Sequence, residues 1–115
     1  MSLPSDYRMI DDQVAVSGQI TVEQVNTIAE SGYKSLICNR PDGEAPDQAE
    51  VAKIEEAAKA AGLAFRNIPV LSSGMTMENV EATRTALDEL ERPIFAYCRS
   101  GARSTNVYNM AKARS

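Results

Sequence analysis

A chain of 115 residues has room for one domain with an apolar core of its own. Hydrophobic residues make up 43% and charged residues 24%, and the formal net charge of −4 disfavours nucleic acid as a partner. Two cysteines and no histidine exclude a disulfide framework, a structural zinc site, a Ser-His-Asp triad and a Cys-His pair. We therefore expect no metal and no other cofactor, and any nucleophile must be activated without imidazole.

The chain is expected to form a single domain over residues 1–115. No apolar run approaches the roughly 18 residues that a membrane helix needs, and no signal peptide opens the chain. These features predict a cytoplasmic protein without a membrane partner. Residues 1–3 are compatible with a vector-derived start, so no element is assigned to them. The sequence gives no indication of an oligomeric state.

The first elements are short. Residues 7–10 and Val14–Ser17 are apolar runs separated by two aspartates, which predicts a hairpin of short strands. Thr21 and Gln24 have the spacing of a capping box and precede an apolar stripe, so a helix is expected to begin here. This helix should end near Gly32.

The next strand is predicted at Ser35–Cys38, and the segment 39–44 that follows it is rich in turn-forming residues. Asp47 is expected to cap a second helix, because Glu50 stands at the capping-box position three residues later. The alanine-rich body of this helix should end at Gly62.

Two more strands and two more helices complete the pattern. Residues 63–70 alternate as a strand does, and Thr76 caps a third helix that ends before Pro93. Ile94–Tyr97 is a short continuous apolar run, typical of a strand covered on both faces. Residues 104–113 are expected to form the closing helix. The alternation predicts an α/β domain with a mainly parallel sheet, whose ligands bind where the strands end.

The segment after the last predicted strand carries the candidate chemistry. Cys98 ends that strand and precedes a helix, at a point where unpaired backbone N–H groups converge. Such a setting, with Arg99 and Arg103 close by, lowers a thiol pKa from about 8.5 into the range of roughly 3.5–7.5. Cys98 is therefore predicted to be a catalytic thiolate, with Arg103 offering a planar fork to an oxyanion. The alternative is an inert cysteine flanked by surface arginines.

Further residues are expected to bind the anionic part of a substrate. Gly101 permits the tight turn that brings backbone amides close to a bound group, and Ser104 either donates to the thiolate or caps the closing helix. The predicted anion-binding residues are Arg99, Ser100, Gly101, Ala102, Ser104 and Arg40.

The segment 98–104 resembles the active loop of rhodanese-type sulfurtransferases, whereas the rest of the chain resembles dual-specificity and tyrosine phosphatases. The most similar family is that of beta-lactamase hydrolase-like phosphatase-like domains (DUF442), over about residues 7–111. The motifs that carry the resemblance are 17–19 (SGQ), 32–37 (GYKSLI), 39–44 (NRPDGE), 68–70 (IPV) and the loop itself. This resemblance implies a three-layer α/β fold of the cysteine phosphatase II type.

Two departures from ordinary phosphatases separate the possible reactions. Their signature has His before the cysteine and five residues before the arginine, whereas here Tyr97 precedes Cys98 and four residues separate Cys98 from Arg103. Those phosphatases also place an aspartic general acid in the loop that corresponds to 71–74, which here contains no acidic residue. The shorter loop closes its amides around a smaller space, which suits a persulfide sulfur better than a tetrahedral phosphate. Sulfur transfer also expels a stable anion and needs no proton donor, so both departures favour it.

Asp42 and Cys38 each allow two interpretations. Asp42 follows a strand at the ligand-binding edge and could act as the missing general acid, although a Pro-Asp-Gly turn explains it better. Cys38 ends the neighbouring strand and could resolve a persulfide, although a buried structural cysteine is the better interpretation.

The favoured hypothesis is a sulfurtransferase that carries sulfane sulfur as a persulfide on Cys98. The first alternative is a phosphatase, in which Cys98 forms a phospho-cysteine, Arg103 binds the phosphate and Asp42 donates the proton. The second alternative is a domain that binds an anion without turnover. In each case the partner is a small anionic molecule, phosphorylated or bearing a persulfide.

Overall fold

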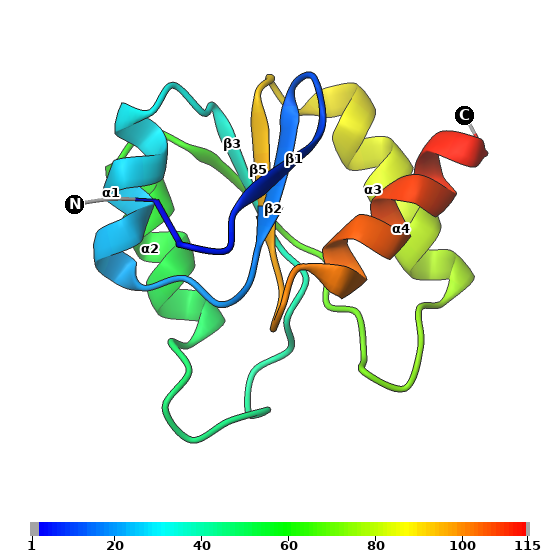
Figure 1. Ribbon diagram of the computed structural model, residues 1–115, viewed down its shortest axis with the longest axis horizontal. Coiled ribbons are helices and arrows are strands. Elements are labelled where there is room, and N and C mark those ends of the chain that lie inside the picture. The colour runs from blue at the N-terminus through cyan, green and yellow to red at the C-terminus, as the bar shows by residue number, and fades with distance from the viewer. Residues whose placement is uncertain (1–2, 115) are drawn as a thin grey trace.

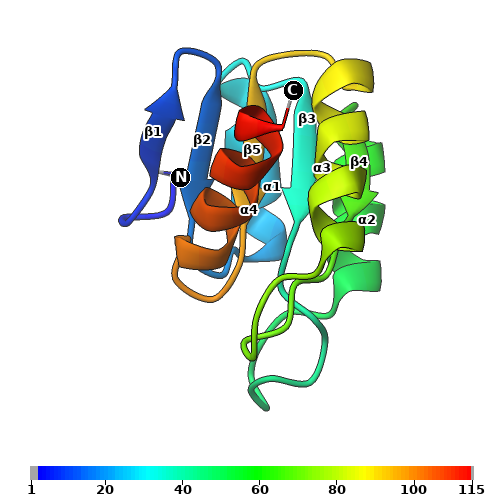
Figure 2. The same ribbon diagram turned by 90° about the vertical axis from the view of Figure 1, so that its right-hand side faces the viewer.

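The computed structural model describes residues 3–114 and has a five-stranded sheet between two layers of helices (Figure 1). The strand order is β1-β2-β5-β3-β4 (Figure 2). Strands β2, β5, β3 and β4 are parallel, and β1 pairs with β2 in the antiparallel direction at one edge. The strands are β1 (Arg8–Asp11), β2 (Val14–Ser17), β3 (Ser35–Cys38), β4 (Ala64–Asn67) and β5 (Ile94–Tyr97). The predicted α/β fold with a mainly parallel sheet is confirmed.

Two helices cover each face of the sheet. Helices α1 (Val22–Glu30) and α2 (Val51–Ala60) lie on one face, and α3 (Met77–Glu89) and α4 (Ala102–Ala113) lie on the other (Figure 1). All four residues of β5 are buried because the strand lies at the centre of the sheet and both of its faces are covered. Its side chains alternate between the two cores: Phe95 and Tyr97 join the core under α1 and α2, whereas Ile94 and Ala96 join the other.

The predicted starts of α1 and α3 are confirmed, whereas the predicted start of α2 is not. Thr21 begins α1 as predicted, and Thr76 begins α3. The prediction that Asp47 caps α2 is wrong, because this helix begins four residues later, at Val51. The backbone N–H of Val51 instead donates to Asp42 Oδ1 at 2.8 Å. Gln48 accounts for the late start, since its side chain accepts hydrogen bonds from two backbone amides of the preceding loop and holds that loop compact.

Two other boundaries differ from the prediction for local reasons. Strand β4 ends at Asn67, before Pro69, which has no N–H to donate to the neighbouring strand. The N–H groups of Ile68 and Val70 still donate to β3 and the residue after it, each at 2.9 Å. Helix α4 begins at Ala102, two residues earlier than predicted, because Gly101 adopts a φ of 93° and turns the chain directly into the helix.

The loops that follow the parallel strands gather at one edge of the sheet. Segments 39–50 and 68–76 extend beyond this edge, next to the turn between β5 and α4 (Figures 1 and 2). In a parallel sheet this carboxyl edge is where ligands bind. No helix within residues 3–114 is both long and apolar enough to cross a membrane.

Candidate active site

Cys98 lies at the point where the chain leaves the sheet. Its backbone N–H donates to the carbonyl of Ser17 at 3.2 Å, which continues the β2–β5 ladder by one residue. Its side chain is fully buried, and the backbone N–H of Gly101 donates to Sγ at 3.0 Å. The chain from Cys98 to Gly101 therefore curls over its own sulfur before α4 begins.

The loop stabilises negative charge on that sulfur. Burial raises the pKa of the Cys98 thiol. Hydrogen bonds from the backbone of Ser104, Ser100 and Gly101 and from the Ser104 hydroxyl lower this pKa by more than burial raises it. The pKa of Cys98 is thus below its ordinary value, in the direction that the sequence predicts. Main-chain and hydroxyl donors thus stabilise the thiolate here, as an imidazolium does in cysteine enzymes that pair the thiol with histidine.

A buried amide fixes the Ser104 hydroxyl. Ser104 Oγ donates to Asn39 Oδ1 at 2.8 Å, and the Asn39 amide donates to the carbonyl of Ile68 at 2.8 Å. Asn39 and Ser104 are each 1% exposed, so neither group can exchange its partner for water. This pair connects the loops after β3 and β4 to the first turn of α4, where Ser104 also donates to the Cys98 sulfur.

Arg103 is held by a carboxylate from another loop. Its NH1 and NH2 groups donate to the two oxygens of Glu44 at 2.8 and 2.7 Å, and NH1 also donates to the carbonyl of Val70 at 2.8 Å. Glu44 Oε1 also accepts from Arg40 Nε at 3.0 Å, and Arg40 NH1 donates to Gln19 at 3.1 Å. One carboxylate therefore orients two guanidinium groups.

This pairing keeps Glu44 ionised. Hydrogen bonds from Arg103 lower the pKa of Glu44 and outweigh the effect of burial, and with the contribution of Arg40 the value falls to about 2. The same carboxylate raises the pKa of Arg103. At neutral pH both members of the pair are charged, and Glu44 has no proton to donate.

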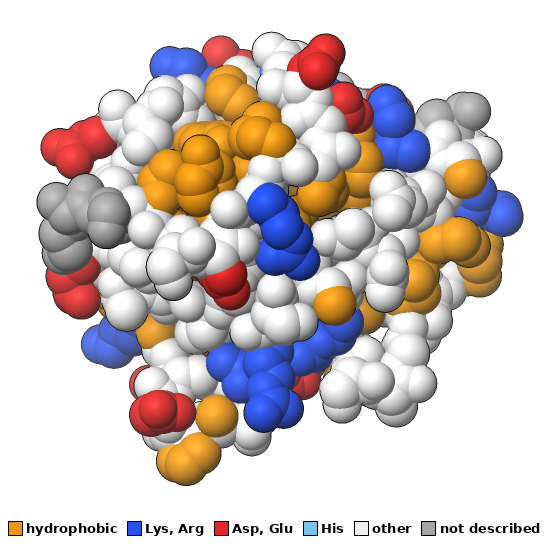
Figure 3. Space-filling view, viewed as in Figure 1, with side chains coloured by type: hydrophobic (Ala, Val, Ile, Leu, Met, Phe, Trp, Pro, Cys, Tyr) orange, Lys and Arg blue, Asp and Glu red, His pale blue; other side chains and the backbone are white. Residues whose placement is uncertain are grey.

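An open pocket of about 350 Å³ lies at this end of the sheet. We call it the anion pocket; it is lined by Glu44, Ser72, Arg99, Ser100, Ala102 and Arg103. Arginine and lysine side chains gather in the lower part of the face shown in Figure 3. Cys98 does not line the pocket, since its fully buried sulfur lies beneath the loop that does. A substrate atom must therefore pass the loop to reach the sulfur.

The remaining predicted residues lie outside the pocket wall. Arg40 is buried beneath Glu44 and is 5% exposed. Asp42 is exposed on the loop after β3, where its carboxylate binds the start of α2, and its role as a general acid stays a prediction. Cys38 is fully buried in the core under α1 and α2. Burial raises the pKa of Cys38, as expected for a structural thiol.

Residues near the N-terminus contact the loop between β5 and α4. Gly18 is close to the loop that follows β5, so that a Cβ at this position would lie 2.7 Å from the carbonyl oxygen of Arg99. The N–H of Gly18 donates to Asp6 Oδ2 at 3.0 Å, and Arg8 NH1 donates to the carbonyl of Ser100 at 3.4 Å. The glycine of the 17–19 motif therefore allows two loops to approach each other.

The structure assigns positions to two residues that the sequence analysis missed. Glu44 was counted only as part of a turn segment, although its position four residues after Arg40 was a usable signal for an ion pair. Asn39 had no comparable signal, because its partner Ser104 is 65 residues away. Within the described residues, no group of three His, Cys, Asp or Glu side chains could hold a metal ion.

A family model described as "Beta-lactamase hydrolase-like protein, phosphatase-like domain" matches residues 6–115. Beta-lactamase hydrolase-like proteins of Xylella fastidiosa and Agrobacterium fabrum are each 33% identical to this chain over 90% of its length. The chain spans only 24% of the length of these relatives.

Solved structures with this fold carry phosphatase names. A candidate phosphatase from Neisseria meningitidis is 33% identical, with a TM-score of 0.82 over 91% of this chain and 75% of that one. A candidate phosphatase (DUF442) from Shewanella putrefaciens is 20% identical, with a TM-score of 0.82 over 98% and 73%. The core catalytic domain of a PP-IP phosphatase from S. cerevisiae is 16% identical, with a TM-score of 0.66 over 88% and 60%. The last two similarities establish the fold alone, which is that of cysteine phosphatases.

Proposed function

The chain belongs to the family of phosphatase-like domains of beta-lactamase hydrolase-like proteins, and from this premise we propose that it transfers sulfane sulfur through a persulfide on Cys98. The names of its structural neighbours favour phosphoester hydrolysis, which is therefore the second candidate. Both reactions begin with the same nucleophile, the Cys98 thiolate. They differ in the leaving group and in whether that group needs a proton.

The observation that carries the proposal is the ionised state of Glu44, whose carboxylate lines the anion pocket. Phosphoester cleavage expels an alkoxide or phenoxide, and a positioned proton donor commonly contributes about 10²–10⁴-fold to such a step. Glu44, with its pKa at about 2, holds no proton at neutral pH. Asp42 already accepts a hydrogen bond from the first turn of α2. The described wall of the pocket thus supplies no carboxylic acid for this task.

The size of the loop supports the same reaction. Only four residues separate Cys98 from Arg103, and the sulfur beneath them is fully buried. A short ring of amides accommodates a single sulfur atom more readily than a tetrahedral phosphate with its oxygens. The persulfide that results would keep its charge next to the amide of Gly101, which already lies 3.0 Å from Sγ.

The proposed first step is balanced without an acid or a redox partner when thiosulfate is the donor. The Cys98 thiolate attacks the outer sulfur of thiosulfate, the new Cys–S–S⁻ bond forms, and the old sulfur–sulfur bond breaks to release sulfite. Sulfite leaves as a stable dianion, so no proton is transferred to it. A thiol or cyanide then removes the outer sulfur and restores the thiolate.

A parallel assay separates the candidates. The protein is given thiosulfate with cyanide and, separately, p-nitrophenyl phosphate, with Cys98→Ser as the control that abolishes either reaction. We expect thiocyanate to form faster than nitrophenol. Faster nitrophenol release that is lost in Asp42→Asn would overturn the proposal and establish the phosphatase. No turnover on either substrate, together with tight binding of sulfate, would indicate an anion-binding domain.

A further inference from the structure

A second pocket of about 160 Å³ adjoins the anion pocket. The two share Ser72 and Arg103 as lining residues, so they lie side by side at this point. The other walls come from the loop after β4 and from α4. We call it the tail pocket, and its remaining side chains include Val70, Leu71, Met75 and Asn106.

The tail pocket differs from the anion pocket in charge. Among the described residues that line it, Arg103 alone is ionisable, and the Glu44 carboxylate already neutralises that guanidinium at 2.7 and 2.8 Å. Leu71 is 57% exposed, so a ligand that covers it removes apolar surface from water. Met75 adds a flexible apolar wall, and Asn106 adds one amide. This combination complements an uncharged, mainly apolar group.

We propose that the tail pocket binds the uncharged tail of the thiol that accepts sulfur from Cys98. The inference rests on the sulfur-transfer function proposed above. In that second step the acceptor thiolate attacks the outer sulfur of the Cys98 persulfide and forms R–S–S⁻. The bond to Cys98 breaks, and Cys98 leaves as the thiolate that the Gly101 amide stabilises. One sulfur atom is transferred from Cys98 to the acceptor, and no external oxidant or reductant is required.

The position of the tail pocket agrees with this assignment. The acceptor sulfur should enter through the anion pocket, because three residues that follow Cys98 line it, namely Arg99, Ser100 and Ala102. A tail attached to that sulfur then meets the shared wall at Ser72 and Arg103 and continues into the tail pocket. Cyanide has no tail, so it needs only the anion pocket and serves as an internal reference.

The experiment compares acceptors that differ in their tails. Protein loaded with thiosulfate is mixed with 1-propanethiol, cysteamine, 3-mercaptopropionate or cyanide, and rates are expressed per thiolate. We expect the neutral thiol to react fastest among the three thiols. The variant Met75→Ala should lower the ratio of the propanethiol rate to the cyanide rate by about three- to tenfold, because it removes apolar contact with the tail alone.

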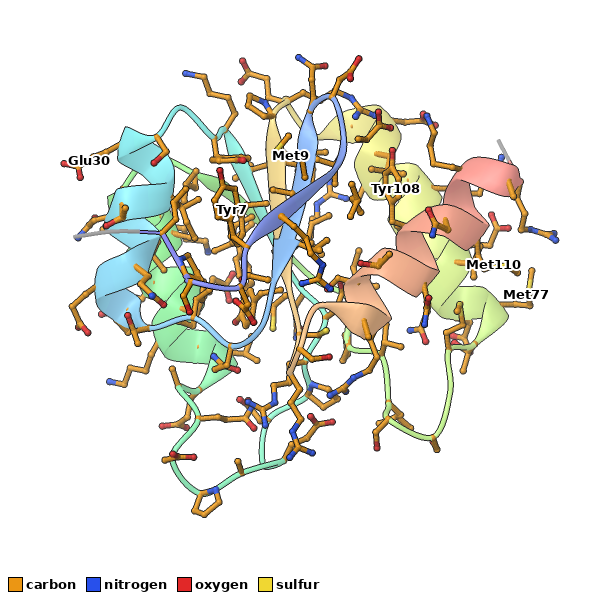
Figure 4. All side chains as sticks on the ribbon, viewed as in Figure 1. Tyr7, Met9, Glu30, Met77, Tyr108 and Met110 are labelled. Carbon is orange, nitrogen blue, oxygen red and sulfur yellow. The ribbon has the colours of Figure 1, made fainter. Side chains whose placement is uncertain are left out.

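Met77 provides the matched control. It is 52% exposed at the start of α3, does not line the tail pocket, and projects outward there (Figure 4). Met77→Ala should leave the propanethiol-to-cyanide ratio unchanged. An equal loss for both acceptors in Met75→Ala, or the same ratio as the wild type, would overturn the tail pocket. Failure of the proposed function looks different: mass spectrometry would then find no sulfur atom added to Cys98 by thiosulfate, whatever residue stands at position 75.

Discussion

Replacing Glu44 by glutamine should destabilise the protein in a manner that depends on pH. The two arginines lower the pKa of this carboxyl from its ordinary 4.5 to about 2, which corresponds to about 3 kcal/mol of stabilisation of the folded state at neutral pH. Because the folded-state pKa is the lower one, this stabilisation is complete above about pH 4.5 and is lost as the pH falls towards 2. Glu44→Gln removes it and also leaves the buried Arg40 without its counter-ion.

Urea unfolding of the wild type and the variant at several pH values measures this difference. We expect Glu44→Gln to cost about 3 kcal/mol at neutral pH and progressively less as the solution is acidified below about pH 4.5. Glu81→Gln is the control, since Glu81 pairs with the exposed Arg84 and such surface pairs contribute about 0–1 kcal/mol. The reasoning is refuted if Glu44→Gln costs no more than Glu81→Gln, or if its cost is the same in acid.

Four further substitutions test the site and its supports. Ser104→Ala removes a donor to the thiolate and should raise the pKa of Cys98 by about one unit, seen as a shift of iodoacetamide alkylation to higher pH; an unshifted profile would contradict this role. Asn39→Ala removes the acceptor that competes with the Cys98 sulfur for the single proton of the Ser104 hydroxyl and should shift the same profile to lower pH, an effect that must vanish when Ser104 is also alanine. Gly18→Ala introduces a Cβ within 2.7 Å of main-chain oxygen and should cost about 1–3 kcal/mol in urea unfolding, whereas wild-type stability would show that the loops can separate freely. Thr76→Ala loses a helix cap and should cost about 1 kcal/mol without moving the alkylation profile of Cys98; a shift would mean that α3 influences the site.

The parts of the fold that the sequence predicted are those with local causes. Thr21 and Gln24 satisfy each other's backbone across three residues, so the start of α1 could be predicted from a short window. Strand β5 followed from four consecutive apolar residues. The start of α2 could not be predicted in this way, because the group that binds its first amide is Asp42, nine residues earlier in a loop. Asp47 had the spacing of a helix cap, but α2 begins four residues after it.

In the candidate site, too, the features with local causes were predictable and the long-range contacts were not. The position of Cys98 between a buried strand and a helix was predictable, since both flanking elements have clear sequence patterns. The sequence predicted that donors other than histidine must lower the pKa of Cys98, because the chain contains no histidine. It left open whether Ser104 is one of these donors. Glu44 and Arg103 are 59 residues apart, and their contact depends on how two loops meet at the edge of the sheet. No local pattern encodes that meeting.

The contact between Glu44 and Arg103 also bears on which reaction the loop can catalyse. In phosphoryl transfer, charge spreads over the equatorial oxygens of the moving group, and a guanidinium that faces those oxygens stabilises the transition state. Here the two terminal nitrogens of Arg103 already bind Glu44 at 2.7 and 2.8 Å, so a phosphate would have to compete with a fixed carboxylate. In sulfane transfer the charge moves along the line of sulfur atoms and returns to Cys98, where the amide of Gly101 is already in place. The donors closest to Cys98 therefore support the proposed transfer of sulfur more directly than the alternative transfer of phosphate.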